Sequence, residues 1–211
     1  MGDGRPAVIA ASVDELMAAL EQLTDVSWAT IRPLVLPIFQ RRRPFAFPTP
    51  PAAVCIVAPG VSIGFAADLG PALVHVHEEL LVRWRVDLEE VHEAAFRNLR
   101  SAVRARAQWS VVREKVQGYE TVAFQSDEGW ASTLLLVPDL IEHVFGPGEH
   151  LFVAPMRDLL IGLPAAVDLE LATWLTSEFE ALDPNALCLE AFLWRDGRLE
   201  IVGLEREAAM A

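Results

Sequence analysis

Residues 119–163 place four local patterns in one continuous stretch, and together they restrict the fold more than any other feature of the chain. A strand is expected at 119–125, and it ends in an acidic turn at 126–129. A helix follows, and then two apolar strands at 150–154 and 159–163 that are joined by only four residues. Strands joined by so short a loop must run antiparallel. The stretch therefore predicts an α+β fold with a mainly antiparallel sheet and about four helices packed against it.

The helix in this stretch has a well-marked end and an ambiguous middle. It starts near Ser132 and stops at Gly146-Pro147-Gly148, a strong termination signal. Pro138 lies between these points. A proline inside a helix removes a hydrogen bond and causes a kink, whereas a proline at the first position of a helix is favoured. The sequence leaves both alternatives open: a helix kinked at Pro138, or a second helix that begins there.

Further elements are expected on both sides of this stretch. Capping residues and apolar residues at three- and four-residue steps predict helices at 12–23, 87–103 and 168–182. Short apolar runs bounded by turn residues predict strands at 54–58, 73–78, 187–194 and 198–202. The last two form a hairpin on Asp196-Gly197, a strong two-residue turn signal. The segment at 29–37 carries two prolines and is at best an edge strand.

The length of the chain predicts its domain organisation. With 211 residues, 53% of them hydrophobic, the chain can bury a substantial core as one domain. We expect an N-terminal helix and tail at 1–28, a single α+β domain at 29–203 and a loose C-terminal tail at 204–211.

Composition excludes several functional classes. The chain has 30 acidic against 17 basic residues, and a net charge of -13 repels nucleic acid. Its apolar runs are far shorter than the roughly 20 residues of a membrane span, and no export signal is recognisable. Cys55 and Cys188 each lie in an apolar run, as buried free thiols do in a reducing compartment. We therefore expect a cytoplasmic protein without a nucleic-acid or membrane partner; its oligomeric state stays open.

Metal and cofactor motifs are weak. His75 and His77 would share one face of a strand and could in principle ligate a metal, but no third ligand has a suitable spacing. No glycine-rich phosphate loop and no nucleophile elbow is present in the sequence. The expectation is a protein without metal or cofactor.

One helix face concentrates positive charge. Arg97, Arg100 and Arg104 recur at three- and four-residue steps of the helix at 87–103, and Glu93 lies one turn before Arg97. Such a face can bind an anion, but a solvated face with a Glu93–Arg97 pair is the preferred interpretation.

Two turns carry the remaining polar candidates. The turn at 127–132 and the hairpin tip at 155–158 both place polar residues beside rigid elements, where binding and catalytic residues are often found. If the strands pair as expected, the two turns lie close together at one end of the sheet. Whether Arg157-Asp158 is a site or only a turn stays open.

Four segments resemble the YtpQ-like family of bacterial proteins, a domain of unknown function. They are Ala67-Asp68-Leu69-Gly70 with Glu93-Ala94-Ala95-Phe96-Arg97-Asn98-Leu99-Arg100, then Glu128-Gly129-Trp130-Ala131-Ser132, then Val153-Ala154-Pro155-Met156-Arg157-Asp158-Leu159-Leu160, and Leu193-Trp194-Arg195-Asp196-Gly197-Arg198-Leu199-Glu200. The chain departs from the family at Thr133, where members tend to have an arginine. The resemblance implies the order of the elements and implies no activity.

The residues considered as functional candidates come from these turns and from the resemblance. They are Asn98, Asp127, Glu128, Trp130, Ser132, Arg157 and Asp158. The preferred hypothesis is a non-catalytic protein-binding module, adaptor or inhibitor-like, whose acidic surface and exposed tryptophans, Trp130 and Trp194, bind a partner protein of basic character. The alternative is an enzyme of unknown reaction at the two turns, with Asp158, Arg157, Glu128, Ser132 and His77 in its site.

Overall fold

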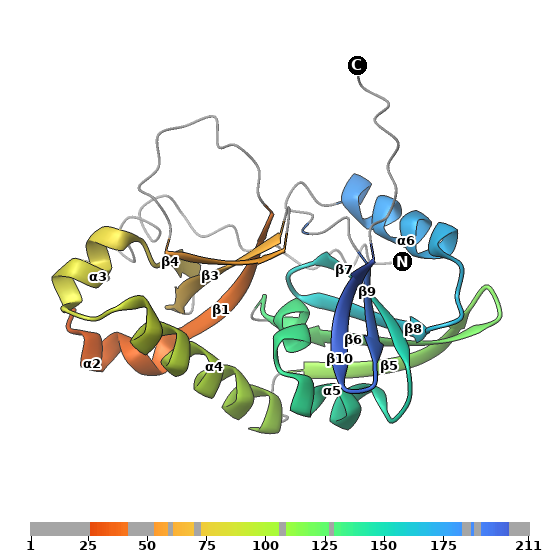
Figure 1. Cartoon of the computed structure of the whole chain (residues 1–211), viewed down its shortest axis with the longest axis horizontal. Coiled ribbons are helices and arrows are strands. Elements are labelled where there is room, and N and C mark those ends of the chain that lie inside the picture. Colours follow the sequence, from red (N-terminus) through yellow and green to blue (C-terminus); the bar gives the residue numbers. More distant parts are fainter. Residues whose placement is uncertain are drawn as a thin grey trace, which may run out of the picture.

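The structure is a computed structural model of the chain, and it describes residues 26–41, 53–58, 61–69, 73–105, 109–126, 129–182, 187 and 191–202. Within these residues the chain forms two antiparallel sheets with helices around them, so the predicted α+β class is confirmed (Figure 1). The expected helix at 12–23 and the tail at 204–211 lie outside the described residues. No helix within the described ranges is long and apolar enough to cross a membrane.

The four-stranded sheet is built from the first part of the chain. Its strands are β1 (Val35–Arg41), β2 (Val54–Ala58), β3 (Val61–Asp68) and β4 (Leu73–His75), with β1 at one edge and β3 paired to all the others. A short helix α2 (Trp28–Ile31) and a 3-10 turn η1 (Arg32–Leu34) lead into β1. The expected edge strand is thus present, but it begins only after Pro33, because that proline lies in the 3-10 turn.

The six-stranded sheet is built from the second part. Its order is β10-β9-β7-β8-β6-β5, and the bounds are β5 (Trp109–Val116), β6 (Tyr119–Ser126), β7 (His150–Met156), β8 (Leu159–Pro164), β9 (Ala191–Arg195) and β10 (Arg198–Val202). The hairpins at 150–164 and 191–202 confirm the sequence expectation. Strand β5 was not expected from the sequence.

Two helices lie between the strands of the first sheet and those of the second in the chain. They are α3 (Glu78–Trp84) and α4 (Leu88–Ala105). The Oδ1 of Asp87 accepts a hydrogen bond from the backbone N–H of Glu90 at 2.8 Å, so the predicted N-cap of α4 is confirmed. The reciprocal half of that cap is not formed, because the Glu90 carboxylate accepts instead from the indole Nε1 of Trp28 at 2.7 Å. This bond ties α4 to α2.

The helical region at 131–145 resolves the ambiguity at Pro138. A 3-10 helix η2 (Ala131–Leu136) is followed by a separate helix α5 (Pro138–Phe145), and Pro138 occupies the first turn of α5. Of the two alternatives, the second helix is therefore the one formed. Pro138 needs no amide hydrogen bond there, and its fixed φ suits the helix start.

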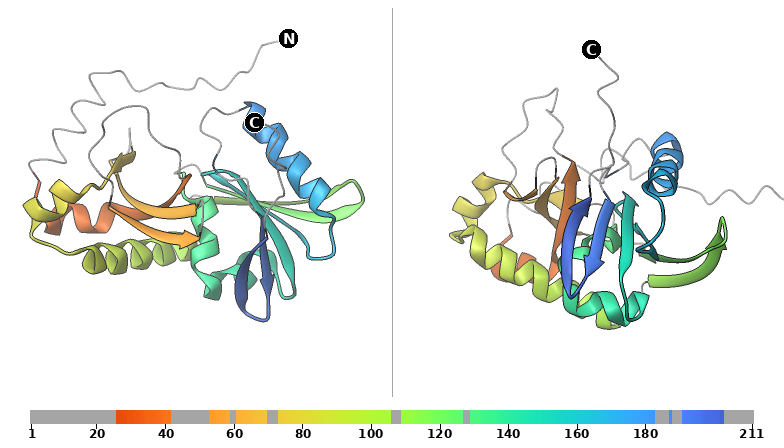
Figure 2. Two further views of the ribbon diagram at one scale, coloured as in Figure 1. Left: turned by 45° about the horizontal axis from the view of Figure 1, so that its top comes forward. Right: turned by 45° about the vertical axis from the view of Figure 1, so that its right-hand side comes forward.

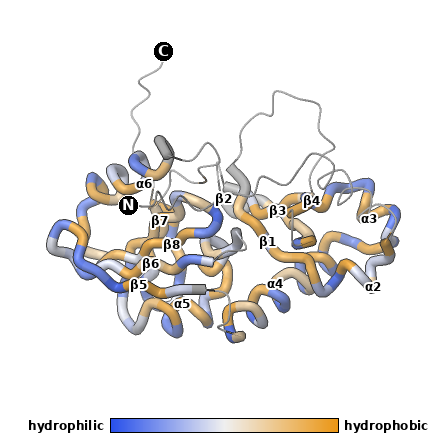
Figure 3. Tube along the Cα trace, turned by 180° about the vertical axis from the view of Figure 1, so that it is seen from behind, coloured by the Kyte–Doolittle hydropathy of each residue, from blue (hydrophilic) through white to orange (hydrophobic). Residues whose placement is uncertain are grey.

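Helices cover both faces of the six-stranded sheet, and strand alternation explains how. Phe152 and Leu160 face η2 and α5, whereas Val153 and Ile161 face the helix α6 (Leu169–Leu182) on the other side. Successive side chains of a strand point to opposite faces, so the inner strands β7 and β8 are buried on both. Figure 1 shows the six-stranded sheet between α6 and α5, and Figure 3 shows hydrophobic residues along its inner strands.

The two sheets share one of these cores. The larger cluster joins residues of the four-stranded sheet and α4 to residues of η2, α5 and the six-stranded sheet. The rings of Phe39 on β1 and Phe192 on β9 lie 5.9 Å apart and connect the two sheets directly. Figure 2 shows α4 running along the four-stranded sheet toward η2 and α5. The polar turns that follow β6 and β7 lie beside this shared core.

Candidate functional site

The two turns singled out in the sequence do meet in the structure, through the backbone. The amide of Ser126 donates to the carbonyl of Asp158 at 3.0 Å, and the amide of Ser132 donates to the carbonyl of Arg157 at 3.0 Å. These bonds form because β8 pairs with β6, which brings the β7–β8 hairpin tip beside the end of β6. The expectation that the two turns are neighbours is therefore confirmed for the described residues. Asp127 and Glu128 lie outside the described residues.

Trp130 is a core residue. Its relative exposure is 0%, its ring lies 5.8 Å from that of Phe124, and its amide donates to the Ser126 hydroxyl at 3.3 Å. Trp194 has an exposure of 3%. The expectation that these two tryptophans are exposed is wrong, because both face the core shared by the sheets. Neither can be the centre of a surface that binds a partner.

Ser132 is buried as well, in the first turn of η2. Its exposure is 0%, and its Oγ has no hydrogen-bond partner among the described groups. A serine nucleophile needs a base within hydrogen-bond reach and access for a substrate. The neighbouring Thr133 instead satisfies its hydroxyl locally, on the carbonyl of Trp130 at 2.6 Å. The geometry at Ser132 is that of a packed turn.

A histidine and an arginine come together beside these turns. His75, at the end of β4, is half-buried, and burial together with the nearby Arg157 guanidinium lowers the pKa of His75 below its ordinary value of 6.5. The Nδ1 of His77 is buried and has no hydrogen-bond partner among the described residues. No group of three or more potential metal ligands occurs within the described part of the chain.

Asn98 links α4 to the start of the four-stranded sheet by side-chain hydrogen bonds. Its Nδ2 donates to two backbone carbonyls, those of Arg32 and Val35, at 2.8 Å each. These two carbonyls flank the point where η1 ends and β1 begins. Both amide protons are therefore used to hold α4 against the entry to the four-stranded sheet. A binding role for Asn98 stays a prediction.

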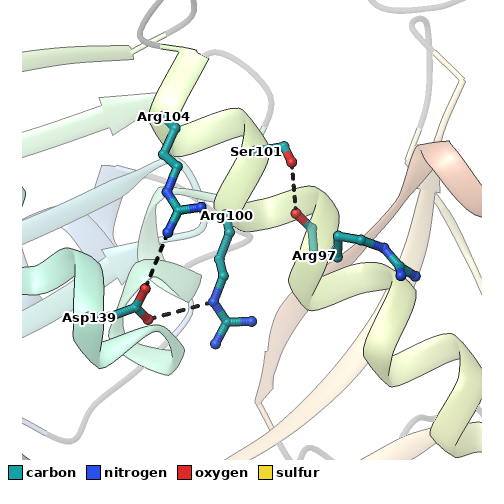
Figure 4. Close-up of polar contacts among 5 residues, drawn as sticks. All are labelled: Arg97, Arg100, Ser101, Arg104 and Asp139. Atoms are coloured by element: carbon teal, nitrogen blue, oxygen red, sulfur yellow. Dashed lines mark hydrogen bonds and ion pairs between the residues drawn. The ribbon is translucent and has the colours of Figure 1, made fainter.

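The arginine face of α4 differs from its expected form. Arg100 and Arg104 both approach Asp139 of α5, at 3.6 and 3.7 Å (Figure 4). Arg97 points away from Asp139, and no Glu93–Arg97 salt bridge forms within the described residues. The predicted Glu93–Arg97 pair is therefore absent, and the arginines instead link α4 to the second part of the chain.

The outer face of α6 carries an exposed tryptophan next to carboxylates. It is the one large aromatic side chain that is exposed on a described helix. Trp174 is 45% exposed, and Glu170 and Glu178 are exposed one helical turn before and after it. Leu171 and Leu175 bury the opposite stripe against β7 and β8. We call Glu170, Trp174 and Glu178 the acidic–aromatic stripe.

Nothing on α6 neutralises this stripe. Residues 158–194 contain seven acidic residues and no lysine, arginine or histidine. The hydroxyls near the stripe are satisfied within the helix: Thr173 donates to the Leu169 carbonyl at 2.8 Å and Ser177 to the Thr173 carbonyl at 2.9 Å. In the part that the structure describes, neither Glu170 nor Glu178 forms a salt bridge. Among the described residues, the stripe is negative and has no ion-pair partner.

The sequence contained the signal for this stripe. Glu170, Trp174 and Glu178 recur at four-residue steps, in between the leucines predicted to be buried, and the base-free segment surrounds them. The leucines at the same spacing predict only the buried side of this helix. Comparison of the chain with family models, with curated proteins and with solved structures finds no match. The resemblance to YtpQ-like proteins stays a prediction.

Proposed function

We propose that this protein is a non-catalytic, cytoplasmic binding module, adaptor or inhibitor-like, which binds a basic segment of a partner protein. The observation that carries the proposal is the acidic–aromatic stripe: an exposed Trp174 between two exposed carboxylates on a helix without a positive charge. In this proposal the exposed tryptophan that binds the partner is Trp174, in place of Trp130 and Trp194.

The chemistry of the stripe favours arginine or lysine side chains. Tryptophan is enriched among the residues that dominate binding energy, and its ring face attracts cations. The flanking carboxylates add charge-assisted hydrogen bonds, and the excess of acids over the whole chain speeds the approach of a basic partner. Helix α6 is held on the six-stranded sheet by its own buried stripe, so the surface is preorganised.

The turn cluster supports the alternative, an enzyme, less well. The Ser132 hydroxyl has no hydrogen-bond partner within the described residues and is fully buried, so the geometry supplies neither activation nor access. The contacts between the two turns that the structure describes are hydrogen bonds of the backbone, from Ser126 to Asp158 and from Ser132 to Arg157.

Titration with a synthetic amphipathic helical peptide rich in arginine and leucine tests the proposal, measured by calorimetry. We expect saturable binding that weakens as salt rises to about 0.3 M, because screening reduces exposed electrostatics. Trp174→Ala should weaken binding by more than about tenfold, as for a residue that dominates an interface. Glu170→Gln combined with Glu178→Gln should weaken it at low salt.

The matched control is Glu79→Gln combined with Glu89→Gln, which removes the same charge from exposed sites on α3 and α4. This control should change affinity much less than the pair on α6. Equal effects of the two pairs would show that net charge alone attracts the peptide, and the stripe would not be a site. Unchanged binding by Trp174→Ala would contradict the proposal as well.

A further inference from the structure

A groove of about 610 Å³ lies along α4, away from the acidic–aromatic stripe. It is lined by Ile63 of β3, Leu136 of η2, and His92, Glu93, Phe96, Arg97 and Arg100 of α4. None of the functional candidates from the sequence lines it. Its volume falls in the range of small-molecule sites, about 300–1,000 Å³.

One wall of the groove is built from apolar and aromatic side chains. Ile63 and Phe96 are 6% and 8% exposed, so their positions are fixed by the core beneath. The His92 ring lies 4.3 Å from the Phe96 ring with an interplanar angle of 30°, and it meets Phe65 edge-on at 6.1 Å. These contacts hold the imidazole and the phenyl ring as adjacent surfaces. A planar apolar group can stack on such a wall.

The rim of the groove has a net positive charge, although the net charge of the whole chain is negative. Two guanidinium groups line it, those of Arg97 and Arg100, against one carboxylate, that of Glu93, so the local balance is 2 − 1 = +1, whereas the chain carries -13. Asp139 is shared by Arg100 and Arg104. Arg97 has no ion-pair partner among the described residues, and Figure 4 shows it extending from α4 away from Asp139.

We propose that this groove binds a small organic monocarboxylate with a flat apolar body. Its carboxylate would pair with the Arg97 guanidinium, which offers two parallel N–H donors, and its body would lie against Phe96 and Leu136. Glu93, one turn before Arg97, and Asp139 disfavour a second negative charge on the ligand. The site is therefore selective for a monoanion over phosphate.

Calorimetric titration of the full chain with 3-phenylpropionate tests this site, with 3-phenylpropionamide and inorganic phosphate as comparison ligands. We expect saturable binding of the carboxylate and affinities at least about tenfold weaker for the neutral amide and for phosphate, the loss of one charge-assisted interaction. Arg97→Gln should weaken carboxylate binding about tenfold, and Arg97→Lys should weaken it less. Glu93→Gln should strengthen it.

The control variant is Arg198→Gln, which removes an exposed arginine of β10 that does not line the groove. It should leave the affinity unchanged, and thermal melting should confirm that each variant is folded. Absence of saturable binding up to about 10 mM would overturn the proposal. Equal affinity for the amide, or an Arg97→Gln affinity equal to that of Arg198→Gln, would overturn it too.

Discussion

The turn cluster around Trp130 and the outer face of α6 around Trp174 have similar local sequences. In the structure, however, one tryptophan is buried and the other is exposed. Each tryptophan has acidic residues nearby in the chain, Glu128 before Trp130 and Glu170 before Trp174. Trp130 is completely buried, whereas Trp174 is 45% exposed. Proximity to charge in the sequence therefore says little about whether an aromatic side chain reaches solvent.

The difference comes from where each residue lies in its element. Trp130 follows β6, and the pairing of β6 with β8 turns the chain back over the core beside Phe124. Trp174 lies on a helix whose other side is already filled by Leu171 and Leu175. A helix with one buried stripe must expose the opposite one. Trp130 is consequently part of the core, whereas the outer face of α6 is exposed to solvent.

The largest expected effect separates the two tryptophans by stability. Trp130→Ala should lower the free energy of unfolding by about 3–5 kcal/mol, because it leaves a large cavity in the shared core. Trp174→Ala should change it by less than about 0.5 kcal/mol, as at an exposed helix position. Urea unfolding followed by circular dichroism measures both. Similar losses for the two variants would remove the distinction between the regions.

A smaller effect is expected at Gly129, which enters the turn cluster with a φ of +72°. A Cβ there would lie 3.2 Å from Leu73 Cδ1, so Gly129→Ala combines a left-handed backbone with a tight contact. The expected loss is about 1–3 kcal/mol in the free energy of unfolding. Gly118→Ala is the matched control, because its φ is +88° and a Cβ there meets nothing within 4 Å.

The control isolates the contact from the backbone strain. We expect Gly118→Ala to lose about 1 kcal/mol from strain alone, less than Gly129→Ala. If the two variants lose equal stability in the same urea experiment, the turn cluster is not tightly packed against β4. The contrast with the open face of α6 would then be weaker than the structure indicates.

Local sequence signals were sufficient to predict much of the fold. The Asp196-Gly197 turn predicted a hairpin, and both residues take the positive φ that a two-residue turn requires, +51° and +71°. The β5–β6 hairpin was missed because Gln117 takes the first such position, at +50°, where asparagine or aspartate is usual. Strand β5 itself is mostly exposed and polar, so it lacks the apolar alternation of a typical strand.

Features that depend on contacts distant in the sequence could not be predicted in the same way. The burial of Trp130 and Ser132 follows from the strand order, in which β8 separates β7 from β6. The ion pairs of Arg100 and Arg104 with Asp139 depend on α5 lying next to α4. By contrast, the acidic–aromatic stripe follows from helical spacing alone. The leucines predict the buried face of the helix, and the residues between them indicate the exposed one.

The smallest expected effect concerns pH, and it distinguishes the two regions by titration. Burial and the Arg157 guanidinium lower the pKa of His75 in the folded protein below 6.5, its ordinary value. As pH falls below 6.5, the unfolded chain therefore binds a proton at His75 before the folded protein does, and stability is lost; above 6.5 this contribution is fully present. His75→Gln should flatten the pH dependence of the unfolding free energy between about pH 7 and 5. Residues 158–194 contain no histidine, so the affinity of α6 for the peptide should stay constant over pH 6–8. The free energy of unfolding should change with pH because of His75, which lies near the turns. An unchanged pH profile for His75→Gln would place the titration elsewhere in the molecule.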